Sequence, residues 1–251
     1  MIQLDHISLG YGSRQLLTDA SAHFEKGQLT ALIGRNGSGK STLLRAIAGL
    51  GNIATGTIRL DGESLAAIPP HRLATRIAFV TTERVRIANL RCRDVVALGR
   101  APYTNWIGRM QEEDRRIVEE ALAAVGMSSY ALRTMDCMSD GECQRIMIAR
   151  ALAQQTPIIL LDEPTSFLDL PNRYELCRLL QRLAHEEQTC ILFSTHELDI
   201  ARSLCDAMAL IDTPHLHHLP TEEMGRSGLI EQLIHIHLHA KQRKRDFQLF
   251  Q

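Results

Sequence analysis

The stretch GRNGSGKST, residues 34–42, decides the fold because it joins two different patterns. An apolar, strand-like run leads into it, and the helix-like run TLLRAIAG leads out of it. In its spacing, G-x-x-x-x-G-K-[ST], the glycines let successive backbone N–H groups point at one anion, while Lys40 adds a charge and Ser41 offers a hydroxyl to Mg²⁺. A glycine-rich turn that merely begins a helix is the alternative, and the order of strand, loop and helix argues against it. The stretch therefore predicts a site for a nucleoside triphosphate.

The composition excludes several classes of protein. The chain has 251 residues, of which 45% are hydrophobic, so it can bury a full core as one domain with or without an insertion. No stretch reaches the roughly 18 apolar residues of a membrane helix, and the first residues lack the pattern of a signal peptide. We therefore expect a cytoplasmic protein. A formal net charge of −1 argues against nucleic acid as a partner.

Strand patterns and helical patterns occupy different parts of the chain. Residues 57–62 resemble a hairpin piece, which predicts an antiparallel edge beside a parallel core sheet. Between residues 81 and 155 the apolar positions recur at helical spacing instead. The six cysteines show no C-x-x-C pairing and are expected as reduced thiols. We expect one domain over 1–251, divided into a core of 1–80 and 156–240, a helical subdomain of 81–155 and a basic tail of 241–251.

Two strand ends carry chemistry-bearing side chains. Asp162 and Glu163 follow the apolar strand 158–161, at the edge where parallel sheets place their ligands. Asp162 is suited to hold Mg²⁺ through its water shell, and Glu163 to orient or deprotonate an attacking water. Helix capping is the alternative role for such acids. His196 follows the strand 189–194 and would reach a γ-phosphate at the same edge, although a lone histidine there is more often structural.

The run MSDGECQR, residues 138–145, stands just ahead of that strand. Ser139 and Glu142 form S-x-x-E, which predicts a capping box at the start of the helix IMIARALA. The short distance along the chain between this helix and the strand before Asp162 indicates a second functional stretch.

Three further features have two interpretations each. Tyr11 would either pack in a turn or present its ring to an adenine. His235, His237 and His239 would share one face of a strand and permit metal binding, without Cys or acidic residues to support it. GRAPYTNW, residues 99–106, is either a packed turn or a surface that faces a partner.

Taken in order, GRNGSGKST, MSDGE, ILLDEP, SFLD and the Thr-His after a strand resemble the ATP-binding cassette (ABC) nucleotide-binding domain over nearly the whole chain. The resemblance implies an α/β fold, with a P-loop NTPase (RecA-like) core, an antiparallel β edge and an inserted α-helical subdomain. A single cassette without a membrane segment resembles the separate ATPase subunit of an importer. VVALGRAPYTNW resembles the helical stretch of the group that imports ferric siderophores, haem and cobalamin.

The resemblance implies a role for each matching position. Catalysis would fall to Glu163 as base, His196 and Lys40, and the Mg²⁺ contacts to Ser41 and Asp162. The residues that it implies as ATP contacts are Tyr11, Gly34, Asn36, Gly37, Ser38, Gly39, Lys40, Ser41 and Thr42 of one subunit, and Ser139, Gly141 and Glu142 for the site of the other subunit.

The resemblance also implies partners. Two copies would sandwich two ATP molecules head to tail, so a homodimer is expected. That dimer would dock on two polytopic permease subunits at the cytoplasmic face of the membrane, with a substrate-binding protein acting indirectly. Two alternatives remain: a soluble ABC ATPase of an iron–sulfur assembly system, and a nucleotide-bound scaffold without turnover.

Two positions depart from the family's pattern. The usual signature L-S-G-G-Q is M-S-D-G-E in this chain, so Asp140 places a negative charge near a triphosphate, offset in part by the helix N-terminus. The strand IAFV normally leads to a glutamine that contacts Mg²⁺ and the lytic water. Here Thr82 takes that place and Glu83 follows it, so either residue is a candidate for the missing contact.

Overall fold

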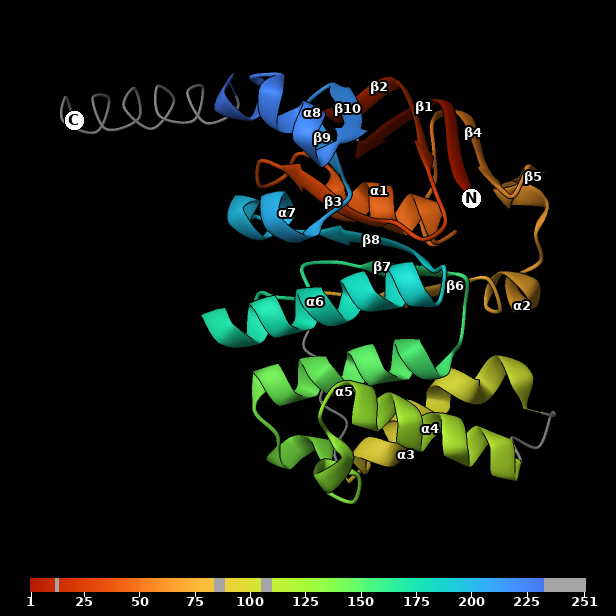
Figure 1. Ribbon diagram of the computed structural model, residues 1–251. Helices are drawn as coiled ribbons and strands as arrows, with labels where there is room; N and C mark the ends of the chain where they lie inside the picture. The colour runs from red at the N-terminus through yellow and green to blue at the C-terminus, as the bar shows by residue number, and fades with distance from the viewer. Residues whose placement is uncertain (12–13, 84–88, 105–109, 233–251) are drawn as a thin grey trace, which may run out of the picture.

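The chain forms stacked layers of two sheets and a set of helices (Figure 1). A computed structural model describes residues 1–11, 14–83, 89–104 and 110–232. The expected basic tail of 241–251 and His235, His237 and His239 lie outside the described residues. The α/β class with a P-loop core, an antiparallel β edge and inserted helices is confirmed.

The antiparallel edge is a sheet of four strands in the order β2-β1-β4-β5. The strand β1 pairs with both β2 and β4 in antiparallel register. The pairing of β4 with β5 across Asp61 and Gly62 confirms the expected hairpin piece. From Ala20 to Phe24 the residues of β2 alternate between more and less buried positions, because only one face of this sheet packs on the core. The strands are β1 (Ile2–Tyr11), β2 (Arg14–Phe24), β4 (Thr55–Leu60) and β5 (Glu63–Ser64).

The core sheet has six strands in the order β10-β9-β3-β8-β7-β6. All neighbouring pairs are parallel except β10 with β9, so the carboxyl ends of five strands meet at one edge. The strands are β3 (Leu29–Gly34), β6 (Ile77–Val80), β7 (Ile158–Leu161), β8 (Cys190–Ser194), β9 (Ala207–Asp212) and β10 (His215–Pro220).

Both faces of the core sheet are buried, which explains why its strands are continuously apolar. Successive side chains of a strand point to opposite faces. In β7, Ile159 and Leu161 belong to the apolar cluster on the helical side, whereas Ile158 and Leu160 belong to the cluster beneath the antiparallel sheet. The helices of the core are α1 (Lys40–Ile47), α2 (Pro70–Leu73), α6 (Leu170–Glu186), α7 (Leu198–Leu204) and α8 (Thr221–Arg226), with a 3₁₀ turn η1 (Leu65–Ala67).

The histidine-rich strand β10 has no counterpart among the strands expected from the sequence. It is half-buried because it lies beside β2: the Thr18 N–H donates to Pro214 O at 2.9 Å, and the His218 ring lies 4.8 Å from that of Phe24. Burial lowers the pKa of His218, because an apolar environment disfavours the imidazolium form. The contact with β2 comes from the tertiary structure, which the His-Leu pattern alone does not reveal.

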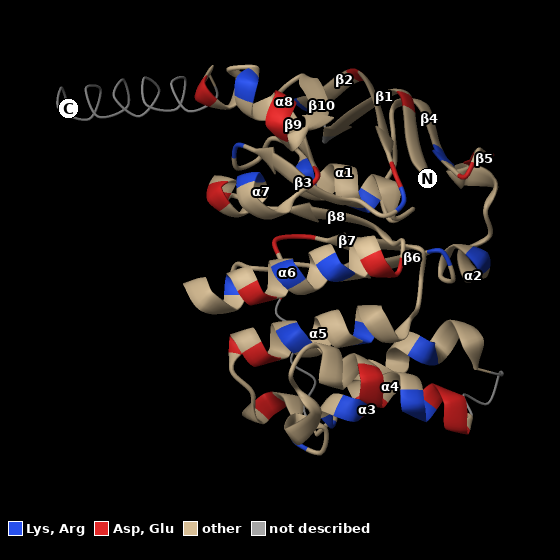
Figure 2. Cartoon of the chain, viewed as in Figure 1, with Lys and Arg blue, Asp and Glu red and all other residues tan. Residues whose placement is uncertain are grey.

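Between β6 and β7 the chain forms helices and 3₁₀ turns and, within its described residues, no strand. Charges of both signs are interspersed on the outer helix α4 (Figure 2), where Arg115 and Arg116 pair with acids three positions earlier. Residues 81–155 as the bounds of a helical subdomain remain our proposal. The elements are α3 (Cys92–Ala97), η2 (Leu98–Tyr103), α4 (Glu112–Ala124), η3 (Ser128–Tyr130), η4 (Met135–Cys137) and α5 (Asp140–Ala153).

The described part of the GRAPYTNW segment is the 3₁₀ turn η2, held by a buried ion pair. Arg100 and Asp114 are each 6% exposed, and Arg100 Nε donates to Asp114 Oδ1 at 2.9 Å. Arg100 Nη1 also donates to Ala153 O at 2.9 Å and to Gln155 Oε1 at 3.0 Å. One guanidinium thus ties η2 and α4 to the end of α5. Trp106 lies outside the described residues.

We predict that Arg100→Leu lowers the free energy of unfolding by roughly 3–5 kcal/mol, because the buried carboxylate of Asp114 loses its only charged partner among the described residues. Urea unfolding followed by circular dichroism measures the loss. The matched control is Arg116→Leu, whose ion pair with Glu113 is exposed and is expected to contribute far less than the buried pair. Equal losses in the two variants would contradict the structural role of Arg100.

Candidate nucleotide site

The loop between β3 and α1 has a backbone that only glycine adopts readily. Gly37 has a φ of 73° and Gly39 a φ of 107°, both in the left-handed region that a Cβ disfavours. A Cβ on Gly34 would lie 2.7 Å from Ile211 O, so the loop also packs closely on β9. These constraints explain the glycines of GRNGSGKST, and they place Lys40 at the first position of α1.

The side chain of Lys40 lies back along the loop. Its Nζ donates to Gly34 O at 3.0 Å and to Arg35 O at 3.3 Å, and the residue is buried. Burial lowers the pKa of Lys40, while the carboxylates of Glu163 and Asp162 raise it. The ammonium therefore faces the interior of the loop with acids close by, as expected of a charge that receives phosphate.

A cavity of about 650 Å³ opens beside the loop at the carboxyl edge of the core sheet. Its volume is within the range of small-molecule sites. The structure brings part of the predicted set together here. Of that set the cavity is lined by Asn36, Gly37, Gly39, Lys40, Ser41, Thr42, Glu163 and His196, and it is also lined by Arg14 and Leu16.

Asp162 lies at the junction of three strands. Its Oδ1 accepts hydrogen bonds from Ser41 Oγ at 3.0 Å and from Ser194 Oγ at 2.7 Å. Its backbone carbonyl accepts from Thr82 Oγ1 at 3.0 Å. The carboxylate is therefore fixed against the start of α1, as a ligand that supports a phosphate-bound cation would have to be.

Glu163 and His196 contact each other at the mouth of the cavity. His196 Nε2 lies 2.6 Å from Glu163 Oε1, and both side chains are partly exposed. Glu163 has a φ of 49°, a left-handed conformation that costs a non-glycine residue about 1–3 kcal/mol. Hydrogen bonds hold it there: its N–H donates to Ser194 Oγ at 2.8 Å, and its carbonyl accepts from Ser166 Oγ at 2.8 Å.

The signature residues form the predicted capping box. Ser139 is the N-cap of α5, with its Oγ accepting from the Glu142 N–H at 3.3 Å, while Glu142 Oε2 accepts from the Ser139 N–H at 2.8 Å. The hydrogen bonds from Ser139, first of all from its backbone, lower the pKa of Glu142. Neither these two residues nor Gly141 is among the described residues that line the cavity of the same chain.

The comparisons with known proteins agree with this geometry. The model of the ABC transporter family matches residues 17–166. The chain belongs to the ABC transporter family. An uncharacterized ABC transporter ATP-binding protein of Methanocaldococcus jannaschii is 41% identical over 84% of this chain and 73% of its own length. The iron(3+)-hydroxamate import ATP-binding protein of Bacillus subtilis is 36% identical over 80% of this chain and 74% of its own length.

One solved structure and one further relative extend the comparison. A dimeric ATP-binding cassette in a post-hydrolysis state, bound to ADP and Pi, has a TM-score of 0.78 and 26% identity, covering 88% of this chain and 99% of its own. A cobalamin import ATP-binding protein of Halobacterium salinarum is 35% identical over 81% of this chain and 50% of its own length. The chain is thus an ABC ATPase of the importer group, which binds and hydrolyses ATP.

The sequence motifs of this ABC ATPase did not identify two residues that line the cavity. Arg14 Nη2 donates to Gly37 O at 3.0 Å, and Leu16 packs within 3.2 Å of the position that a Cβ on Gly39 would occupy. Both come from the start of β2, which no phosphate-binding pattern marks. Tyr11 pairs with Arg14 at the end of β1, but its side chain is outside the described part of the structure.

Thr82 and Glu83, the two candidates for the contact that the missing glutamine would make, have different partners. Thr82 contacts the backbone of Asp162, as described above. The Glu83 carboxylate lies 3.3 Å from Arg45 Nη2 on α1 and is largely exposed. In this arrangement, Thr82 is the candidate already joined to the site.

The donor set of this ABC ATPase fits Mg²⁺. Ser41 Oγ and Asp162 Oδ1, 3.0 Å apart, are the hard oxygen donors that this cation prefers. Nowhere in the described residues do three His, Cys, Asp or Glu side chains form a cluster that could hold a metal ion by themselves. Among the helices that the structure describes, none combines the length and apolar character that crossing a membrane requires.

We predict that Lys40→Ala weakens the binding of ATP about tenfold or more, because the phosphates lose a buried positive charge. Titration with a fluorescent ATP analogue measures the dissociation constant. Lys26→Ala is the matched control, since it removes the same charge from an exposed turn. An unchanged affinity in Lys40→Ala would remove this residue from the phosphate site.

Proposed function

We propose that this ABC ATPase powers an importer for a ferric siderophore, haem or cobalamin. One observation carries the ATPase part of the proposal: the phosphate loop, Asp162 and the Glu163–His196 pair line or border a single cavity. The chain that holds this cavity is similar to import ATP-binding proteins for an iron(3+) hydroxamate and for cobalamin. Nothing in these comparisons points to the alternative of an iron–sulfur assembly ATPase.

The residues would divide the reaction as follows. Lys40 and the loop amides would hold the phosphates, and Mg²⁺ held by Ser41 and Asp162 would neutralise phosphate charge. Tyr11, whose side chain lies outside the described residues, stays the residue predicted to contact adenine. Glu163 accepts a proton from the attacking water at its carboxylate. The contact of His196 Nε2 with Glu163 Oε1 supports this role, because it orients the base at the mouth of the cavity.

A third contact to Mg²⁺ or to the water would come from Thr82 or Glu83. Thr82 is already joined to the site, since its hydroxyl donates to the backbone carbonyl of Asp162. Glu83 must first leave Arg45. Ser139, Gly141 and Glu142 would complete the site of a second copy, and the dimeric state of a similar cassette supports that arrangement.

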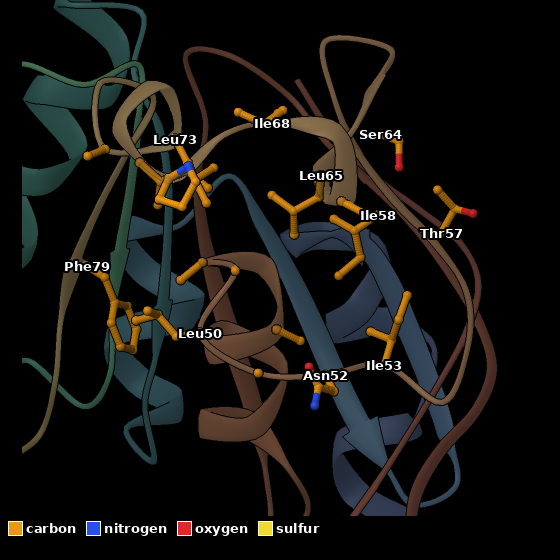
Figure 3. A pocket seen from close by; sticks show the side chains of 18 of the residues that line it. Leu50, Asn52, Ile53, Thr57, Ile58, Ser64, Leu65, Ile68, Leu73 and Phe79 are labelled. Carbon is orange, nitrogen blue, oxygen red and sulfur yellow. The ribbon is translucent and has the colours of Figure 1, made fainter.

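An apolar groove supports docking on a membrane subunit. This groove, about 700 Å³ in volume, lies between the end of α1, the antiparallel sheet and α2 (Figure 3). Leu50 is 67% exposed beside it, and Leu65, Ile68, Leu73 and Phe79 line its walls. Exposed apolar surface of this kind suits one face of a partner's helix. We propose a cytoplasmic helix of a polytopic permease subunit as its occupant.

The groove touches both the core and the helical region. Gln154, which follows α5, lines it, and its Nε2 donates to Ala74 O at 2.6 Å and to Ile77 O at 3.0 Å. Tyr103 of η2 is joined to the same place, because its hydroxyl donates to Gln154 O at 2.9 Å. The docking surface would therefore include Tyr103 and Pro102, two residues of the segment expected to face a partner.

We predict that the wild-type protein copurifies from solubilised membranes with a many-spanning permease. Leu50→Glu should lower the recovered permease about tenfold, because it places a charge in the apolar contact. Leu132→Glu is the control, since Leu132 is 63% exposed but lies outside the groove. Stable association with iron–sulfur scaffold components alone would contradict the importer role, and equal recovery in both variants would exclude the groove.

A further inference from the structure

A single buried hydroxyl links the two acidic residues of the site. Ser194, the last residue of β8, is 0% exposed. Its Oγ lies 2.7 Å from Asp162 Oδ1 and 2.8 Å from the backbone nitrogen of Glu163. No phosphate-binding or catalytic motif of the sequence includes this serine.

The direction of both hydrogen bonds follows from the groups involved. A backbone N–H can only donate, so Glu163 donates to Ser194 Oγ. An ionised carboxylate can only accept, so the one hydroxyl proton of Ser194 goes to Asp162. The hydroxyl is thus used as donor and acceptor at the same time, and its loss would affect both acidic residues.

Each of the two acidic residues depends on this hydroxyl for its conformation. Asp162 Oδ1 has Ser41 and Ser194 as hydroxyl donors, and the Ser194 bond is the shorter. Glu163 is held in the left-handed region with its N–H turned toward Ser194. That conformation brings the Glu163 side chain to His196, two residues after Ser194 in the chain.

The position of Ser194 in the sheet makes it a rigid support. It pairs with Leu32 of β3, the strand that leads into the phosphate loop, and the next N–H, of Thr195, donates to Leu32 O at 3.1 Å. On its other side β8 pairs with β7, which ends at the two acids. The hydroxyl therefore lies where the strands that carry the loop, the acids and the histidine adjoin.

We infer that Ser194 is a positioning residue for ATP hydrolysis, which fixes Asp162 beside Ser41 and holds Glu163 in the conformation that faces His196. This inference rests on the roles proposed above for the two acids. A purely structural serine would contribute to stability alone. A positioning serine also sets the rate of turnover and the Mg²⁺ concentration that nucleotide binding requires, and these two quantities distinguish the roles.

The test compares Ser194→Ala with Thr156→Val. Thr156 is also buried and donates to Ile158 O at 2.8 Å, but it precedes β7 at the end opposite the site. For Ser194→Ala we expect kcat to fall roughly 10- to 100-fold, the typical effect of losing a group that orients a metal ligand. ATP binding without Mg²⁺ should stay unchanged, whereas the Mg²⁺ concentration for half-maximal binding of the fluorescent ATP analogue should rise. Thr156→Val should lower the unfolding midpoint and leave kcat and the Mg²⁺ dependence as in wild type.

Two more substitutions at this position keep the test decisive if the alanine variant does not fold. Ser194→Thr retains the hydroxyl and should restore kcat to within a few-fold of wild type, even if its extra methyl lowers stability. Ser194→Cys has similar size but a weaker donor and should give an intermediate kcat. Wild-type kcat and Mg²⁺ dependence in Ser194→Ala or Ser194→Cys would overturn the inference.

Glu163→Gln, measured in parallel, separates this inference from the proposed function. Loss of turnover in Glu163→Gln together with normal turnover in Ser194→Ala would overturn the role of Ser194 alone. Normal turnover in Glu163→Gln would remove Glu163 from the proposed role of base and overturn the inference that Ser194 holds it there, while the import function would still be tested by the copurification experiment.

Discussion

The site depends on the parallel pairing of β3, β8 and β7 in the middle of the core sheet. Parallel strands end at a common edge, so the phosphate loop after β3, the acids after β7 and the histidine after β8 emerge beside one another. Burial of both sheet faces keeps that register, because a slip by one residue would exchange the side chains of two separate apolar clusters. The antiparallel sheet and the helices on the opposite face make this double burial possible.

One helix connects the two surfaces at which this ABC ATPase is proposed to meet its partners. α5 begins at the signature cap of Ser139 and ends next to Gln154 in the groove, a length of about 21 Å. At the groove, Gln154 binds the backbone at Ile77 of β6, and the same strand leads to Thr82 and so to the backbone of Asp162. The start of α5, where a second copy is proposed to bind, is therefore connected through packed residues and hydrogen bonds to the groove and to the two acids.

Short motifs at strand ends were sufficient to predict most of the side chains that line the cavity. Glu163, His196 and Lys40 could be assigned to one edge because each follows an apolar strand, and a parallel sheet brings such ends together. Ser194 could not be predicted, since it reads as one more residue of a buried strand until its distance to Asp162 is known. The strand β10 and the apolar groove were also not predicted, because both form only where elements distant in sequence pack together.

We propose that two copies of the chain close over two nucleotides, so that the phosphate loop, acids and histidine of one copy and the signature residues of the other form each site. Light scattering of Glu163→Gln, with and without MgATP, tests it most directly, with bound nucleotide counted in the same sample. We expect a monomer without nucleotide and a stable dimer holding two ATP molecules with MgATP, because binding persists while hydrolysis does not. A monomer at saturating MgATP, with nucleotide bound, would contradict the claim.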